Sequence, residues 1–219
     1  VIPEQEALAF YYPDRGNNDY QLRITDKNGQ FIKELLPVDP KSKVLHGLGQ
    51  NFYVYDGKLN VFPHFSNTIF SITPDSTTQR YHFYFGDYHF PDDEIFQKKE
   101  YNSQAIMSEI MNNSYVRLMA PYETDEHLLV KYYVKRQVLL GIYNKKKHTA
   151  INLDPEMVID SLHLGTFPVP IGFNHNEFIG QLTLDIQQKN RIMIPELQKL
   201  MADYSEDSNP ILIFYSLRS

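Results

Sequence analysis

Short runs in which apolar and polar residues alternate with a period of two dominate the chain, and turn residues separate them. Residues 20–25 (YQLRIT) and 31–35 (FIKEL) are two such runs, and they flank the dipeptide Asn28-Gly29. Alternation over four to eight residues predicts a half-buried β-strand, and Asn-Gly between two strands predicts a tight hairpin. The pattern therefore predicts an all-β chain that is built from antiparallel hairpins.

Four strand-like runs follow one another closely in the next part of the chain, with the turn Asp56-Gly57 between the first two. They occupy residues 51–55, 59–62, 68–73 and 80–85. Connections this short leave no room for a crossover helix, so neighbouring strands must be antiparallel. The sequence thus predicts a four-stranded meander here, a second one between 115 and 153, and a third from about 172 to 215.

One hairpin pattern recurs along the chain. LRITDKNGQFIKEL (22–35) and LGIYNKKKHTAINL (140–153) share leucine, isoleucine, Asp or Asn, and leucine at the same offsets. FSITPDSTTQRYHF (70–83) has the same rhythm of strand, turn and strand. Such self-similarity indicates an internal repeat of one supersecondary unit.

Two segments have the features of helices instead. Residues 91–112 carry acidic residues in the first turn, where carboxylates suit the helix dipole, and apolar residues spaced i, i+4 further on. Residues 195–204 begin with proline, which is favoured at the first helical position, and then place apolar residues on one face. We expect both to be helical insertions on the outside of a β architecture.

Repeated meanders with tight turns are what the blades of a β-propeller need. The chain also resembles a family of six-bladed β-propeller lipoproteins of Bacteroidetes whose function is unknown. The resemblance lies in YQLRITDKNGQFIKELLP (20–37), SNTIFSITPDSTTQRYHFYFGDYHFP (66–91) and EDSNPILIFYSL (206–217). These motifs are structural, and no catalytic motif accompanies them.

The resemblance implies a propeller of four-stranded antiparallel blades, of which this chain covers about three to four. The expected blade-like units are 1–47, 48–90, 115–160 and 161–219, within a single domain or the C-terminal part of one. Members of the family are longer, so the chain is expected to be a fragment that lacks N-terminal blades. The resemblance also implies export, with a periplasmic or outer-membrane-anchored location.

Composition excludes several classes of protein. The net charge of −6 and the pI of about 5.7 argue against nucleic-acid binding. No apolar run approaches 18 residues, so no membrane span is expected. The basic run Lys145–Lys147 is interpreted as a solvated turn. The GLG at 47–49 does not extend to a dinucleotide fingerprint, and we expect no cofactor.

Two polar loops are the candidate ligand sites. Asn174, His175 and Asn176 lie between aromatic neighbours in GFNHNEF (172–178), and such a loop could bind a ligand, hold a metal ion with a distant carboxylate, or satisfy its own backbone. Tyr122 and Glu123 begin an acidic loop. A tyrosine offers flat area and a hydroxyl to a sugar or peptide, although it could equally fill an interface between blades.

No residue is assigned a catalytic or metal-ligating role. Histidines at metal-binding helical spacing and a nucleophile elbow are both absent from the sequence, and the carboxylate pairs have structural roles in turns or at a helix start. The sequence favours a non-catalytic β-propeller that binds a glycan or peptide, or acts as a scaffold, and the resemblance implies that it does so in the bacterial cell envelope. The alternatives are a propeller hydrolase or lyase that acts on glycans, and a purely structural partner in an envelope assembly.

Overall fold

The computed structural model of the protein describes most of the chain. The described residues are 1–2, 6–12, 18–38, 51–63, 66–89, 103–113, 115–135, 137–155, 167–182, 195, 199 and 210–217. Contacts divide the chain into two compact units. Unit 1 comprises Val1–Ala120 and Tyr132–Gln137, and unit 2 comprises Pro121–Lys131 and Val138–Ser219.

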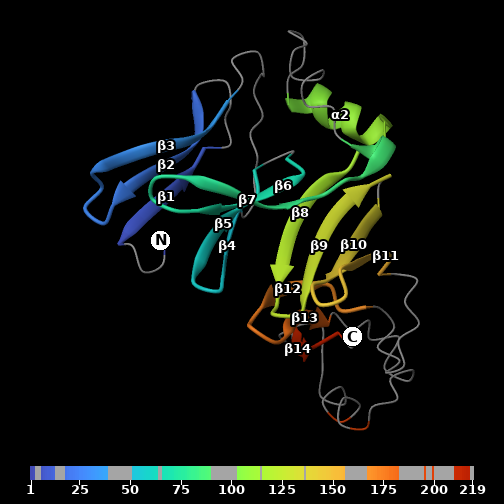
Figure 1. The fold of residues 1–219 in the computed structure, drawn as a ribbon. Coiled ribbons are helices and arrows are strands. Elements are labelled where there is room, and N and C mark those ends of the chain that lie inside the picture. The colour runs from blue at the N-terminus through green and yellow to red at the C-terminus, as the bar shows by residue number, and fades with distance from the viewer. Residues whose placement is uncertain are drawn as a thin grey trace. The chain divides into compact units, whose positions relative to one another are not determined.

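The first sheet is an antiparallel three-stranded meander (Figure 1). Its strands, in spatial order, are β1 (Ala7–Tyr11), β2 (Tyr20–Asp26) and β3 (Phe31–Pro37). In the turn between β2 and β3, Gly29 has a φ of 84°, a conformation that glycine adopts without strain. The Asp26 carboxylate accepts hydrogen bonds from the backbone N–H groups of Asn28 (2.9 Å) and Gln30 (2.8 Å). The predicted hairpin is confirmed.

The second sheet is the four-stranded meander that the close-set strands predicted. Its strands, in spatial order, are β4 (Phe52–Tyr55), β5 (Lys58–Val61), β6 (Thr68–Ile72) and β7 (Thr77–His82). Asp56 (φ 50°) and Gly57 (φ 65°) are both left-handed. Two left-handed central residues are typical of the type I′ hairpin turn, whose twist matches that of the strands.

The remaining two sheets are also antiparallel. The third sheet contains β8 (Arg117–Glu123), β9 (His127–Val134), β10 (Gln137–Asn144) and β11 (Thr149–Leu153), in that order across the sheet. The fourth sheet contains β12 (Pro170–Phe173), β13 (Phe178–Leu182) and β14 (Ile211–Tyr215). These sheets match the expected meanders in strand direction, although the fourth has three strands among the described residues.

The hairpin repeat has a structural counterpart in the register of the strands. Leu22 pairs with Leu35 across β2 and β3, and Leu140 pairs with Leu153 across β10 and β11. The leucines that define the repeat are therefore directly opposite each other in both hairpins. A cross-strand pair of this kind lies on one face of the sheet. The repeated leucines therefore mark a side-chain contact between the two strands as well as a repeated spacing in the sequence.

Each unit has its own apolar core. In unit 1, Leu22, Ile24 and Val61 belong to one fully buried cluster. In unit 2, the buried cluster consists of Leu129, Leu140 and Phe178. Phe178 begins β13 immediately after the polar loop at 174–177, so the core of unit 2 anchors one end of that loop.

The expectation of a β-propeller is wrong. The described strands form four separate antiparallel sheets of three or four strands, and they do not close into a barrel or propeller. Alternation and turn residues determine which strands pair locally, but they carry no information on whether successive sheets pack around a common axis. The two helical insertions are not found as expected. The described residues hold the helix α2 (Ser103–Asn113), which coincides with the last part of the expected helix over 91–112, and the short 3-10 helix η1 (Gly86–Tyr88). Residues 91–102 of that expected helix lie outside the described residues.

The second expected helix, 195–204, falls almost wholly outside the described residues. In the described part of the chain, no helix has the length and apolar character that a membrane crossing requires.

Candidate functional site

Two loops of unit 2, which the sequence singled out separately, lie side by side. One loop connects β8 to β9 and contains Asp125, and the other connects β12 to β13 and contains His175. The backbone N–H of Asp125 donates a hydrogen bond of 2.9 Å to the carbonyl oxygen of His175. Residues 50 positions apart in the chain therefore form one polar surface.

The loop at 174–177 is shaped by the side chain of its first residue. The Asn174 side-chain oxygen accepts hydrogen bonds from the backbone N–H groups of Asn176 (3.0 Å) and Glu177 (2.9 Å). The Asn174 amide nitrogen donates to the Glu177 carboxylate at 3.4 Å. Asparagine is favoured in turns because it can make such bonds to its own backbone. The side chain of Asn174 therefore defines the shape of the turn.

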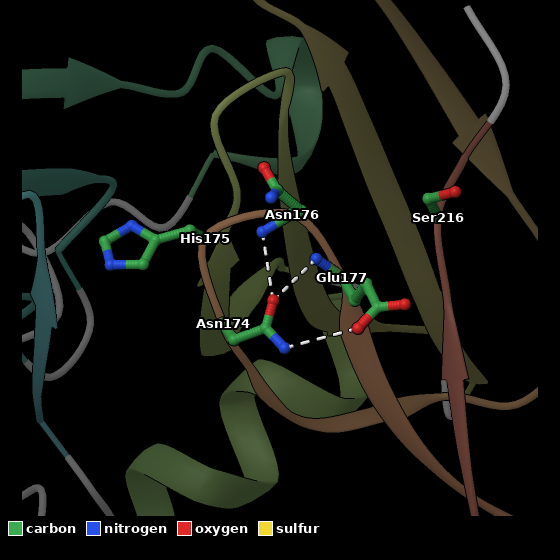
Figure 2. Close-up of a pocket in the computed structure, with 5 residues that line it drawn as sticks. All are labelled: Asn174, His175, Asn176, Glu177 and Ser216. Carbon is green, nitrogen blue, oxygen red and sulfur yellow. Dashed lines mark hydrogen bonds between the residues drawn. The ribbon is translucent and has the colours of Figure 1, made fainter.

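A pocket of about 540 Å³ opens beside this turn. Asn174, His175, Asn176 and Glu177 line it together with Ser216, which follows β14 (Figure 2). In Figure 2 the Glu177 side chain extends toward Ser216, whereas the His175 imidazole points away from the other labelled side chains. The Asn176 amide and the Ser216 hydroxyl make no hydrogen bond within the described part of the chain, which leaves both available to a ligand.

Tyr122 and Glu123 do not line this pocket. Tyr122 packs against the buried cluster of unit 2, and burial raises the pKa of its hydroxyl. The Glu123 side chain is 0% exposed and forms a salt bridge of 2.7 Å with Lys145, whose side chain is 18% exposed. A carboxylate buried in this way is found only with a partner. Tyr122 and Glu123 therefore belong to the buried part of unit 2, whereas Asn174, His175 and Asn176 line the pocket.

Lys145 is the supporting residue that the sequence interpretation missed. Its ammonium group also donates a hydrogen bond of 2.6 Å to the carbonyl oxygen of Thr124. Its backbone N–H donates a hydrogen bond of 2.8 Å to the carbonyl oxygen of Glu126. Lys146 pairs with the exposed carboxylate of Glu126, and that hydrogen bond is the main reason why the pKa of Glu126 is lowered. The basic turn thus holds the acidic loop in place. An acidic residue in an apolar strand would have been the signal for a buried cationic partner.

A buried histidine completes this support. His127 is 4% exposed, and the Asn144 amide donates a hydrogen bond of 3.1 Å to its Nε2, which assigns the ring proton to Nδ1. Burial lowers the pKa of His127, the charges of Lys145 and Lys146 lower it further, and the charge of Glu126 opposes them. His127 is consequently a neutral structural group at neutral pH.

The chain matches one known protein family along nearly its whole length. The sequence profile of a family described as a domain of unknown function, DUF4934, matches residues 2–216. The chain belongs to the DUF4934 family. No curated protein matches the chain.

Among solved structures, this DUF4934 chain is similar to a protein of Bacteroides fragilis NCTC 9343 that is provisionally named an exported protein. The two share 18% sequence identity with a TM-score of 0.82, over 100% of this chain and 64% of the other. At this identity the likeness shows a common fold. The DUF4934 chain spans 64% of the length of that structure.

The pocket of this DUF4934 chain is lined by side chains that can donate and accept hydrogen bonds. Among the described residues, no three side chains of the metal-binding types gather to hold a metal ion. Of the nearby carboxylates, Glu123 is sealed by Lys145 and Glu177 accepts a hydrogen bond from Asn174.

Proposed function

We propose that this chain is a non-catalytic binding protein of the bacterial cell envelope, and that it recognises a glycan or a peptide through the pocket at 174–177 and Ser216. The observation that carries this proposal is the pocket of about 540 Å³, around which the turn at 174–177 presents amides and a carboxylate and Ser216 presents a hydroxyl. A volume of this size accommodates a ligand of several rings or residues. Groups that both donate and accept hydrogen bonds suit hydroxyl-rich or amide-rich ligands.

The exported location belongs to the same proposal. Its support is the fold shared with the B. fragilis protein whose provisional name describes it as exported. Periplasmic location or anchoring by a lipid would be tested by expressing the full-length gene in its own organism. Fractionation that places the product in the cytoplasm would contradict this part of the proposal and leave the binding proposal intact.

Binding is tested by screening the purified chain against an array of neutral and acidic glycans and an array of short peptides. We expect saturable binding to one class. Asn176→Ala and Ser216→Ala should each weaken it about three- to tenfold, which corresponds to the loss of one hydrogen bond. Asn28→Ala is the matched control, because Asn28 is an exposed asparagine in a hairpin turn of unit 1. Binding that both pocket variants leave unchanged would overturn the proposal.

A scaffolding role has its own supporting observation. Leu212 (51% exposed) and Phe214 (55% exposed) lie two residues apart on β14 and thus face the same side of the sheet. Exposed apolar side chains close together on a sheet are typical of interaction surfaces. A photo-crosslinking residue at position 212, compared with one at the exposed position 147, would reveal a specific partner in intact cells. Equal labelling at both positions would contradict this role.

A further inference from the structure

We propose that unit 1 carries a second and separate binding site, which takes a single neutral sugar unit. The site is a pocket of about 150 Å³ at one end of the first sheet. Its lining includes Tyr12, Asn18, Asp19, Arg23 and Glu34. It shares no residue with the pocket of the proposed function, so the two proposals can be tested independently.

An exposed ion pair on two neighbouring strands lines this pocket. Arg23 on β2 pairs directly with Glu34 on β3 in the register of the sheet. The guanidinium donates to one carboxylate oxygen, Oε1, from Nη2 at 2.6 Å and from Nε at 3.2 Å. Because a guanidinium has five N–H donors, the two bonds to Glu34 leave further donors of Arg23 for Tyr12 or a ligand. Within the described residues, the second oxygen of Glu34 makes no hydrogen bond.

An aromatic ring forms a second wall. The Tyr12 ring lies with its centroid 5.6 Å from the Arg23 guanidinium carbon. The backbone N–H of Tyr12 donates to the carbonyl oxygen of Gln21 at 2.8 Å, which continues the pairing of β1 and β2 as far as this ring. The Arg23 guanidinium lies over this ring, so the ring and the hydroxyl of Tyr12 form a wall of the pocket together with Arg23.

The balance of charge selects the ligand class. Asp19 and Glu34 carry two negative charges against the single positive charge of Arg23, so an anion would be repelled. A metal ion would meet the guanidinium among its ligands, and no group of metal-binding side chains occurs in the described residues. A neutral ligand whose hydroxyls both donate and accept hydrogen bonds satisfies the carboxylates and the guanidinium together.

The size of the pocket limits the ligand to one ring. Drug-sized ligands occupy about 300–1,000 Å³, and this pocket is smaller than that range, at about 150 Å³. We therefore assign a monosaccharide unit, either free or at the end of a chain. A ligand with so few atoms should bind with a dissociation constant on the order of 1 mM.

The test is an NMR titration of the isotope-labelled chain with the methyl glycosides of glucose, galactose, mannose and N-acetylglucosamine. We expect one of them to shift the amide signals of Asp19, Arg23 and Glu34 in a saturable manner. Glu34→Gln and Tyr12→Phe should weaken this binding, the first about three- to tenfold. The spectrum of each variant reports directly whether it is folded.

Two matched controls distinguish binding at this pocket from binding elsewhere on the chain. Lys27→Gln breaks an exposed ion pair with Glu6 near the same sheet and should leave the glycoside shifts unchanged. Asn176→Ala should also leave them unchanged, because it alters only the pocket of the proposed function. The proposal is overturned if no glycoside shifts these amides, if Glu34→Gln binds as well as the parent chain, or if only inorganic phosphate or Ca²⁺ produces the shifts.

Discussion

Removing Lys145 should destabilise the protein more than removing the partner that it neutralises. In a Lys145→Met variant, the carboxylate of Glu123 stays at 0% exposure without its counter-ion. Breaking a buried ion pair in this way costs about 3–5 kcal/mol of unfolding free energy, because a charge is left without water or a partner. Methionine keeps most of the apolar stem of the lysine, so lost packing contributes little.

The reverse change should cost less. In Glu123→Gln, the remaining ammonium group of Lys145 is 18% exposed on a flexible stem and keeps its hydrogen bond to the Thr124 carbonyl oxygen. It can therefore remain solvated, and we expect a loss of about 1–3 kcal/mol from the hydrogen bond and the altered carboxyl group. The double variant Glu123→Gln/Lys145→Met removes both charges and should be more stable than Lys145→Met alone.

Urea unfolding at pH 7, followed by circular dichroism, measures the three variants against the parent chain. The midpoint gives the stability, and an unchanged slope shows that the same surface is exposed on unfolding. Two results would refute the reasoning. One is a loss below about 1 kcal/mol for Lys145→Met, which would mean that the carboxylate finds water. The other is a double variant that is less stable than Lys145→Met.

Three further outcomes follow from the same unit. Burial in the folded state holds the pKa of His127 below its ordinary value of 6.5, so the neutral imidazole contributes fully to stability above about pH 6.5 and this contribution is lost as the pH falls toward the folded pKa. In His127→Gln, the free energy of unfolding measured with urea should therefore change less between pH 7 and pH 5 than in the parent chain. Gly180→Ala should lower the thermal midpoint, since a Cβ there would lie 2.8 Å from the Cβ of Pro168, whereas Gly172→Ala meets nothing closer than 3.7 Å and should be tolerated. Phe178→Ala should cost about 3–5 kcal/mol in urea unfolding, because Phe178 is 1% exposed in the core; a loss under 1 kcal/mol would contradict this placement.

The hairpins could be predicted because their determinants are local. Asp56-Gly57 and Asn28-Gly29 are dipeptides whose turn chemistry needs no tertiary context, and the structure places both in hairpin turns with left-handed glycines. The repeated leucines were informative for the same reason, since a period of two combined with a turn of fixed length sets the register. Closure into a ring was a different kind of expectation. It depends on contacts between sheets, and alternation within a strand does not encode them.

The part of the candidate site that depends on local contacts could also be predicted from the sequence. Asn174 shapes its own turn, so its role can be inferred from the neighbouring residues in the sequence. Glu123 cannot be interpreted in that way, because its partner Lys145 lies beyond a complete hairpin and belongs to a run that, taken alone, resembles a solvated turn. Only the burial of the Glu123 carboxylate shows that Lys145 is a structural partner and not a solvated residue. A polar loop can therefore be recognised from sequence, whereas the buried ion pair that supports it becomes visible only when the strands are placed side by side.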